Sequence, residues 1–335
     1  MFDILENLCR IYGASGNEEM VREYILSEIE GFAEAKVDAL GNIIAFKKGE
    51  NTPAKKIMLD AHMDEVGIIV TDITAEGFLR FSTVGGIKAS VLLCRRVVFE
   101  NGVNGVISLK PIHLLSGDEG KTVPKEDSLY IDIGAASRAQ AEEMINIGSF
   151  GVLEGEYIKS GNNIKSRALD DRIGCAVLID LIKSKSQYDF YAVFSVQEEV
   201  GARGAKTAAY AVEPDFSIVL EGTTANDIAD TPYNKQVCEL GKGAAVSFMD
   251  SGTLYDRELF STAINSGIPC QIKRANAGGN NAGSIHLTKN GVRTIAISVP
   301  CRYIHSPSSV ANTEDIKSAR RLAEYLINAI GRGTR

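Results

Sequence analysis

Two adjacent carboxylates, Glu198 and Glu199, could do chemistry together, because they directly follow an apolar segment at 191–196 that reads as a buried strand. Side chains alternate along an extended chain, so neighbouring side chains at a strand end point in roughly opposite directions. One carboxylate can then bind a metal ion while the other faces a cleft and transfers a proton. The pair indicates a metal-dependent hydrolase, provided that further ligands converge on it.

Further candidate ligands lie just past other predicted strands and at the start of a predicted helix. They are His62, Asp170, Glu221 and His305. In a co-catalytic site two metal ions lie about 3.5–4 Å apart and share an activated water, and several nitrogen or oxygen ligands hold them. Asp64 lies two residues beyond His62 on the same strand face, so we expect it to orient the imidazole. Together these residues predict a two-metal hydrolase.

Each motif also has an ordinary structural explanation when it is taken alone. His62 and Asp64 fit a packed histidine beside an unrelated acid, since so short a motif often arises by chance. Two acids at a helix start, Asp170 and Asp171, are electrostatically favourable without a metal ion. The Glu198–Glu199 pair also fits an exposed charge pair, because such pairs are common on surfaces.

Composition places the chain among ordinary globular proteins and excludes several classes of partner. Its 335 residues are 44% hydrophobic and 24% charged, with a net charge of −7 and no basic block, so we expect no nucleic-acid partner. No apolar run approaches membrane-spanning length, and the first residues lack a signal-peptide pattern. The six cysteines form no CxxC pair, which favours free thiols in a cytoplasmic protein over a structural zinc site.

The order of predicted elements indicates an α/β sandwich with an insert. Helical and strand patterns alternate in residues 1–66 and again in 165–335. Between them, residues 67–164 show short alternating apolar runs broken by Gly, Asn and Asp, a pattern typical of β-hairpins. We therefore expect a catalytic domain of 1–66 and 165–335 and a β-rich inserted domain of 67–164.

At these positions the chain resembles the M42 family of metallo-aminopeptidases over nearly its whole length. This group comprises the glutamyl and tetrahedral aminopeptidases and was once also described as endoglucanases. The resemblance rests on six blocks that occur in this order: Leu59–Gly67, Lys110–Leu115, Ala168–Cys175, Gln197–Ala205, Leu240–Gly243 and Tyr303–Pro307.

The resemblance implies a role for each candidate residue. His62, Asp170 and Glu221 would hold one divalent ion, and Asp170, Glu199 and His305 would hold a second. Zinc or cobalt is the expected metal. Glu198 would be the general base that helps to remove N-terminal residues from short peptides.

The resemblance also implies a three-layer α/β/α sandwich with a mixed sheet, in which the insert is a barrel-like dimerisation domain. It implies a cis peptide bond between Asp170 and Asp171. Dimers would build a homo-oligomer such as a tetrahedral dodecamer.

Two departures from the family pattern leave other functions open. Glu221 stands where many members carry Asp, and Asn280–Asn281 stands where Thr-Asp is expected, within a glycine-rich segment at 277–283 that could line the substrate pocket. One alternative is a non-catalytic, self-assembling scaffold of the same fold. Another is a glycoside hydrolase, which would use two opposed carboxylates without a metal ion.

Overall fold

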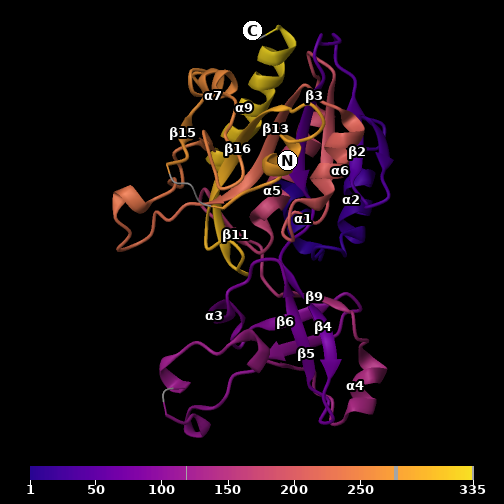
Figure 1. Cartoon of the computed structure of the whole chain (residues 1–335), viewed down its shortest axis with the longest axis vertical. Coiled ribbons are helices and arrows are strands. Elements are labelled where there is room, and N and C mark those ends of the chain that lie inside the picture. The colour runs from indigo at the N-terminus through magenta and orange to yellow at the C-terminus, as the bar shows by residue number, and fades with distance from the viewer. Residues whose placement is uncertain (118, 275–277, 334–335) are drawn as a thin grey trace.

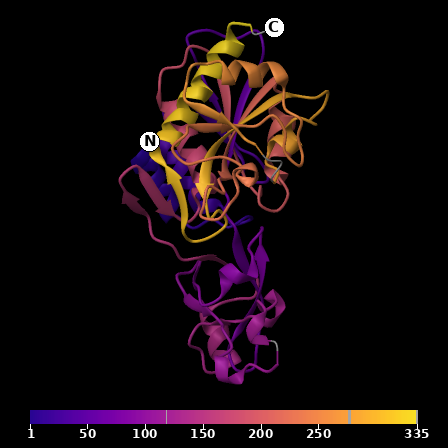
Figure 2. The ribbon, with the colours of Figure 1, turned by 90° about the vertical axis from the view of Figure 1, so that its left-hand side faces the viewer.

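The computed structural model describes residues 1–117, 119–274 and 278–333, which form two units placed end to end along the long axis of the molecule (Figure 1). The larger unit is a mixed sheet with helices packed against it, and the smaller unit is a closed antiparallel barrel. The view from the side shows the same two units (Figure 2). This arrangement confirms the expected α/β fold with a barrel-like insert.

In the described chain the larger unit contains an 11-stranded sheet whose centre is parallel. Nine strands follow one another across it: β1 (Glu34–Val37), β2 (Ile43–Lys47), β12 (Phe190–Ser195), β3 (Ile57–His62), β13 (Phe216–Thr224), β16 (Arg293–Arg302), β17 (Ser309–Asn312), β11 (Asn163–Ser166) and β10 (Ile158–Ser160). Two more, β14 (Ala244–Val246) and β15 (Cys270–Ile272), branch from β16. Strands buried on both faces read as continuous apolar runs, and β3 is buried at every residue.

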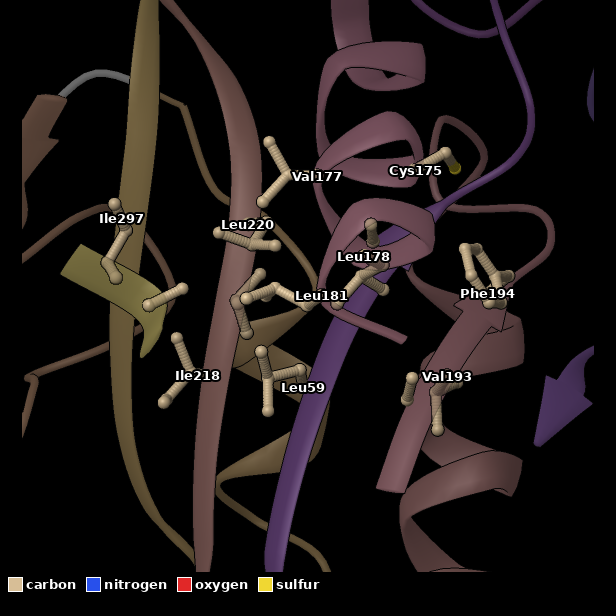
Figure 3. Close-up of a cluster of buried hydrophobic side chains, with 14 of the residues drawn as sticks. Leu59, Cys175, Val177, Leu178, Leu181, Val193, Phe194, Ile218, Leu220 and Ile297 are labelled. Atoms are coloured by element: carbon tan, nitrogen blue, oxygen red, sulfur yellow. The ribbon is translucent and has the colours of Figure 1, made fainter. Parts of the chain in front are cut away.

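Helices pack on this sheet and form the outer layers of the sandwich. They are α1 (Phe2–Arg10), α2 (Glu19–Ile29), α5 (Leu169–Lys183), α6 (Arg203–Val212), α7 (Arg257–Ile264), α8 (Ala282–Ile285) and α9 (Thr313–Gly331). Helix α5 packs on β3 and β13, where Leu178 and Leu181 lie among buried side chains such as Leu59 and Ile218 (Figure 3). No helix in the described ranges is long and apolar enough to cross a membrane.

One predicted helix is much shorter than its apolar pattern suggested. The sequence pattern predicts a helix near 281–289, but α8 ends at Ile285. Lys289 has a φ of 51°, in the left-handed region, and the backbone N–H of Gly291 donates to the carbonyl of Thr288. This turn reverses the chain before β16, so a helix cannot continue through it.

The smaller unit closes a six-stranded barrel around its own apolar core. Its strands are β4 (Gly67–Ile73), β5 (Leu79–Val84), β8 (Ile131–Asp132), β7 (Asn104–Ile107), β6 (Arg96–Phe99) and β9 (Phe150–Leu153). Closure leaves none of these strands with a free edge. The unit also contains two short helices, α3 (Ala89–Leu92) and α4 (Arg138–Met144), and single 3₁₀ turns at Ile112–Leu114, Glu119–Lys121 and Glu126–Ser128. A further 3₁₀ turn, Tyr233–Lys235, belongs to the larger unit.

The barrel strands end before the boundary expected from sequence. β9 ends at Leu153, whereas β10 and β11 pair with each other and β11 pairs with β17 of the large sheet. The range 67–164 therefore contains the barrel and also a hairpin strand of the larger unit. Alternating apolar residues look the same in both sheets, so the sequence pattern could not separate them. β11 leads directly to the start of α5.

A buried arginine ties the start of α5 to the N-terminal helix. The guanidinium of Arg172 is fully buried and donates to the backbone carbonyls of Leu8 and Ile11 at 2.6 Å and 3.1 Å. It lies 3.3 Å from Glu65, which also pairs with buried Arg167. These bonds join the start of α5 to two carbonyls at the end of α1, which also accept from the backbone N–H of Ile11 and from Arg167.

Replacing Arg172 by Met should destabilise the fold by about 3 kcal/mol, because the buried Glu65 carboxylate and the carbonyls of Leu8 and Ile11 lose a charged donor. Urea unfolding followed by circular dichroism measures the change. Lys317→Met is the matched control, since Lys317 forms an exposed pair with Glu314 on α9 that should contribute less than about 1 kcal/mol. Equal unfolding midpoints for the two variants would contradict this account.

Candidate metal centre

The fold brings the predicted ligands to one edge of the large sheet. β3 ends at His62, β12 leads into Glu198 and Glu199, β13 carries Glu221, and β16 leads into His305. These four strands are parallel neighbours, so their carboxyl ends meet at the same edge. Asp170 reaches the same place from the start of α5. All five predicted ligands therefore meet in one cluster.

Asp170 lies between the two imidazoles. Its Oδ1 is 3.4 Å from Nε2 of His62, and its Oδ2 is 3.4 Å from Nε2 of His305. His62 Nε2 also lies 3.2 Å from Oε1 of Glu221, and His305 Nε2 lies 3.2 Å from Oε2 of Glu199. The cluster thus has two halves that share one carboxylate, as a bridging ligand requires.

Hydrogen bonds on the far side of each ring orient the two histidines. His62 Nδ1 is 3.0 Å from the backbone carbonyl of Asp64, and His305 Nδ1 is 2.9 Å from the carbonyl of Gly86. Each carbonyl can only accept, so Nδ1 carries a proton, and a neutral ring would present the lone pair of Nε2 to a metal ion. We expected the Asp64 carboxylate to orient His62, but its Oδ1 lies 3.4 Å away, farther than the carbonyl.

The Asp64 carboxylate instead fixes the turn that carries the adjacent glutamates. Its two oxygens accept the backbone N–H groups of Glu198 at 3.0 Å and Glu199 at 3.1 Å. Ser15 donates its hydroxyl to the same carboxylate at 2.5 Å, and Glu18 accepts the N–H of Gln197 at 3.1 Å. In sequence, Ser15 and Glu18 read only as part of a cap and turn before α2, because their partners lie far along the chain.

Asp171 is a second acid within reach of His62. The peptide bond between Asp170 and Asp171 is cis, as the resemblance implies. His62, Asp171 and Glu221 form one group whose ligand atoms lie within 4.8 Å of one another. However, Asp171 already accepts the backbone N–H groups of His62 and Gly174 at 3.3 Å and 3.0 Å, whereas Oδ1 of Asp170 has no hydrogen-bond donor. Asp170 is therefore the better ligand.

Several buried carboxylate oxygens in the cluster lack a donor. They are Oδ1 of Asp170, Oε1 of Glu199 and Oε2 of Glu221. An unpartnered buried oxygen of this kind is costly unless a cation compensates it. Carboxylate and imidazole ligands suit several divalent ions, including zinc and cobalt. The donor set therefore fits bound metal ions.

The pKa values of two residues in the cluster are both shifted upward, which favours added positive charge at this site. Burial raises the pKa of Glu198 to about 8, and the nearby charges of Glu199 and Asp170 add to this effect. Burial lowers the pKa of His305, but its hydrogen bonds to Asp170 and Glu199 outweigh that effect and raise the pKa to about 11. Protons and metal ions are alternative sources of positive charge for such a site.

The two unexpected asparagines are buried beside the cluster. Asn281 donates through Nδ2 to Asp60 at 2.6 Å and to Ser195 at 2.8 Å, and Asn280 donates to the hydroxyl of Tyr255 at 3.1 Å. Both asparagine side chains are thus directed at internal partners. Ala277, the first residue of the glycine-rich segment, lies outside the described residues.

Comparisons with known proteins identify the family of the chain. Residues 41–322 match the M42 glutamyl aminopeptidase family. A putative aminopeptidase of Acetivibrio thermocellus is 43% identical to this chain, with 98% of each chain covered.

Solved structures show the same similarity. A TET aminopeptidase from a marine sediment archaeon of the Thaumarchaeota superposes with a TM-score of 0.93 at 35% identity, covering 97% of this chain and 95% of the other. The TET1 peptidase of Pyrococcus horikoshii, described as assembling into a tetrahedron or a large octahedral shell, superposes with a TM-score of 0.84 at 35% identity, covering 97% and 98%. The chain therefore belongs to the M42 glutamyl aminopeptidase family and is a peptide hydrolase of the aminopeptidase type.

Proposed function

We propose that this aminopeptidase works with two divalent ions and uses Glu198 as its general base. His62, Asp170 and Glu221 would hold one ion, and Asp170, Glu199 and His305 would hold the other. The single observation that carries the proposal is the position of Asp170, whose two oxygens face the two imidazoles at 3.4 Å each. Zinc and cobalt are the proposed metals, because both accept nitrogen and oxygen ligands.

Glu198 is placed to move the proton during hydrolysis. When bound, the two metal ions would polarise the substrate carbonyl and lower the pKa of a bound water toward neutrality. Glu198 takes a proton from the water that attacks the peptide carbonyl and returns it to the leaving amine. The Asp64 carboxylate accepts the backbone N–H of Glu198 at 3.0 Å. This bond fixes the backbone of Glu198 and so limits how far the Glu198 carboxyl can move between the two proton transfers.

The substrates would be short peptides with a free amino group. Glu221 keeps one buried oxygen without a donor, and this oxygen could accept a hydrogen bond from the substrate amine beside the first ion. The longer arm of Glu221 still brings its other oxygen within 3.2 Å of His62. The exchange of Asp for Glu at this position is thus compatible with the proposed ligand set.

We propose that the chain forms a homo-oligomer, such as a tetrahedral dodecamer built from dimers. The similarity to the P. horikoshii TET1 peptidase, which assembles into a tetrahedron or an octahedral shell, supports this proposal. Within the expected insert of 67–164, the barrel would mediate dimerisation, and 1–66 with 165–335 would form the catalytic domain together with β10 and β11.

Glu198→Gln should retain metal binding and lose peptide hydrolysis by about 10²- to 10⁴-fold, because an amide cannot accept the proton. Steady-state kinetics with aminoacyl-chromophore substrates, together with elemental analysis, measures both properties. Glu314→Gln on the exposed start of α9 is the control and should leave kcat unchanged. Full activity of the Glu198 variant would remove this residue from the role of base.

Removal of metal ions by a chelator should abolish hydrolysis of aminoacyl substrates, and added zinc, cobalt or manganese should restore it, because the base alone cannot polarise the carbonyl. A panel of aminoacyl-chromophore substrates assayed before and after dialysis tests this. A glycoside hydrolase would tolerate the chelator, and a scaffold would stay inactive with every metal. Either result would contradict the proposal.

A further inference from the structure

A loop of the barrel reaches into the candidate metal centre of the other unit. This loop, Gly85–Ile87, lies between β5 and α3. The carbonyl oxygen of Gly86 lies 2.9 Å from Nδ1 of His305. Gly85 packs against Glu199, because a Cβ atom added at Gly85 would lie only 3.0 Å from the Cβ of Glu199. Two of the three proposed ligands of the second ion therefore touch the barrel loop.

The other half of the cluster is held by the α/β unit itself. His62 Nδ1 bonds the carbonyl of Asp64, and Oε1 of Glu221 accepts the backbone N–H of Gly222 at 3.2 Å. These partners come from the link after β3 and from β13. The two proposed ions thus differ in which unit orients their ligands.

The points where the chain enters and leaves the barrel border the same half of the cluster. Val66 lies just before β4, and Leu153 is the last residue of β9. Both line a small cavity together with Glu199 and His305. The contact between the loop and the second half of the cluster is thus part of a continuous junction.

We propose that Gly85 and Gly86 are positioning residues that complete the site of the second ion, so that its occupancy depends on the placement of the barrel. The inference rests on the two-ion function proposed above. A carbonyl that accepts from the far nitrogen of a ligating imidazole fixes the tautomer and the ring orientation, and loss of such a partner typically weakens metal binding by about 10- to 100-fold. Gly86 supplies this carbonyl to His305.

Glycine at position 85 allows the loop to approach this closely. Its φ is +85°, a left-handed conformation that favours glycine. An added Cβ would meet Cγ1 of Val66 at 2.9 Å as well as Cβ of Glu199. Any side chain at this position must therefore push the loop away from His305 or move Glu199.

Gly102 provides a matched control for the backbone effect. It lies in the β6–β7 turn of the same barrel with a φ of +84°, and no described heavy atom lies within 4 Å of an added Cβ. Gly85→Ala and Gly102→Ala thus carry a similar conformational cost, but only Gly85→Ala presses on a proposed ligand. The double variant Val66→Ala/Gly85→Ala removes the closer clash, which is with Val66, and keeps the clash with Glu199. It therefore tests the same contact even if the single variant misfolds.

The experiment titrates the metal-free full-length protein with Zn²⁺ and measures affinity and stoichiometry by calorimetry and elemental analysis. We expect two ions per chain for the natural protein and for Gly102→Ala. Gly85→Ala and the double variant should bind one ion with unchanged affinity and the second about 10- to 100-fold more weakly.

Each other result overturns the inference. Unchanged binding of both ions by Gly85→Ala and the double variant would show that the loop does not position the second site, while the proposed function would stand. An equal loss of both ions would assign the loop a purely structural role. If the natural protein bound fewer than two ions, the two-ion function would fail and the inference with it.

Discussion

The burial of several carboxylates at one sheet edge is the constraint on which this structure depends. Asp170, Glu199 and Glu221 each bury an oxygen atom that has no hydrogen-bond donor. Removing an ion from water costs several kcal/mol unless opposite charge compensates it. The two histidines and the two cations proposed above would compensate this negative charge. The ligands therefore have to stay close together, although they come from distant parts of the chain.

The rest of the fold holds these groups in place. Parallel pairing of β12, β3, β13 and β16 fixes the spacing of the strand ends, which a flexible loop could not do. Asp64 then fixes the turn after β12 through two backbone N–H groups. Behind the cluster, Arg172 links α5 to the end of α1. The barrel adds the Gly85–Ile87 loop on the side of His305. Stability and chemistry thus rely on the same connections.

Much of this arrangement could be predicted from residue types and their periods. Apolar runs ending in His62 or in Glu198 and Glu199 indicated strand ends, and helix–strand alternation indicated the α/β sandwich that brings them together. The placement of β10 could not be predicted, because alternating residues do not specify which sheet they join. The length of α8 depended on a left-handed residue, Lys289, that sequence does not mark.

Other features could not be predicted because they involve backbone atoms or distant partners. The carbonyl of Gly86 orients His305, but a backbone carbonyl is present in every residue and leaves no signal of its own. Asn281 was expected to line a substrate pocket, and its direction toward Asp60 follows from packing that no local pattern encodes. Both cases depend on contacts between segments more than 200 residues apart.

The most direct test of the central claim is anomalous X-ray diffraction from crystals of the protein grown with Zn²⁺. The account predicts two ions about 3.5–4 Å apart, one on each side of Asp170 and each bound to one of its oxygens. One ion would lie beside His62 and the other beside His305. A single ion, or two ions that do not share Asp170, would contradict the account.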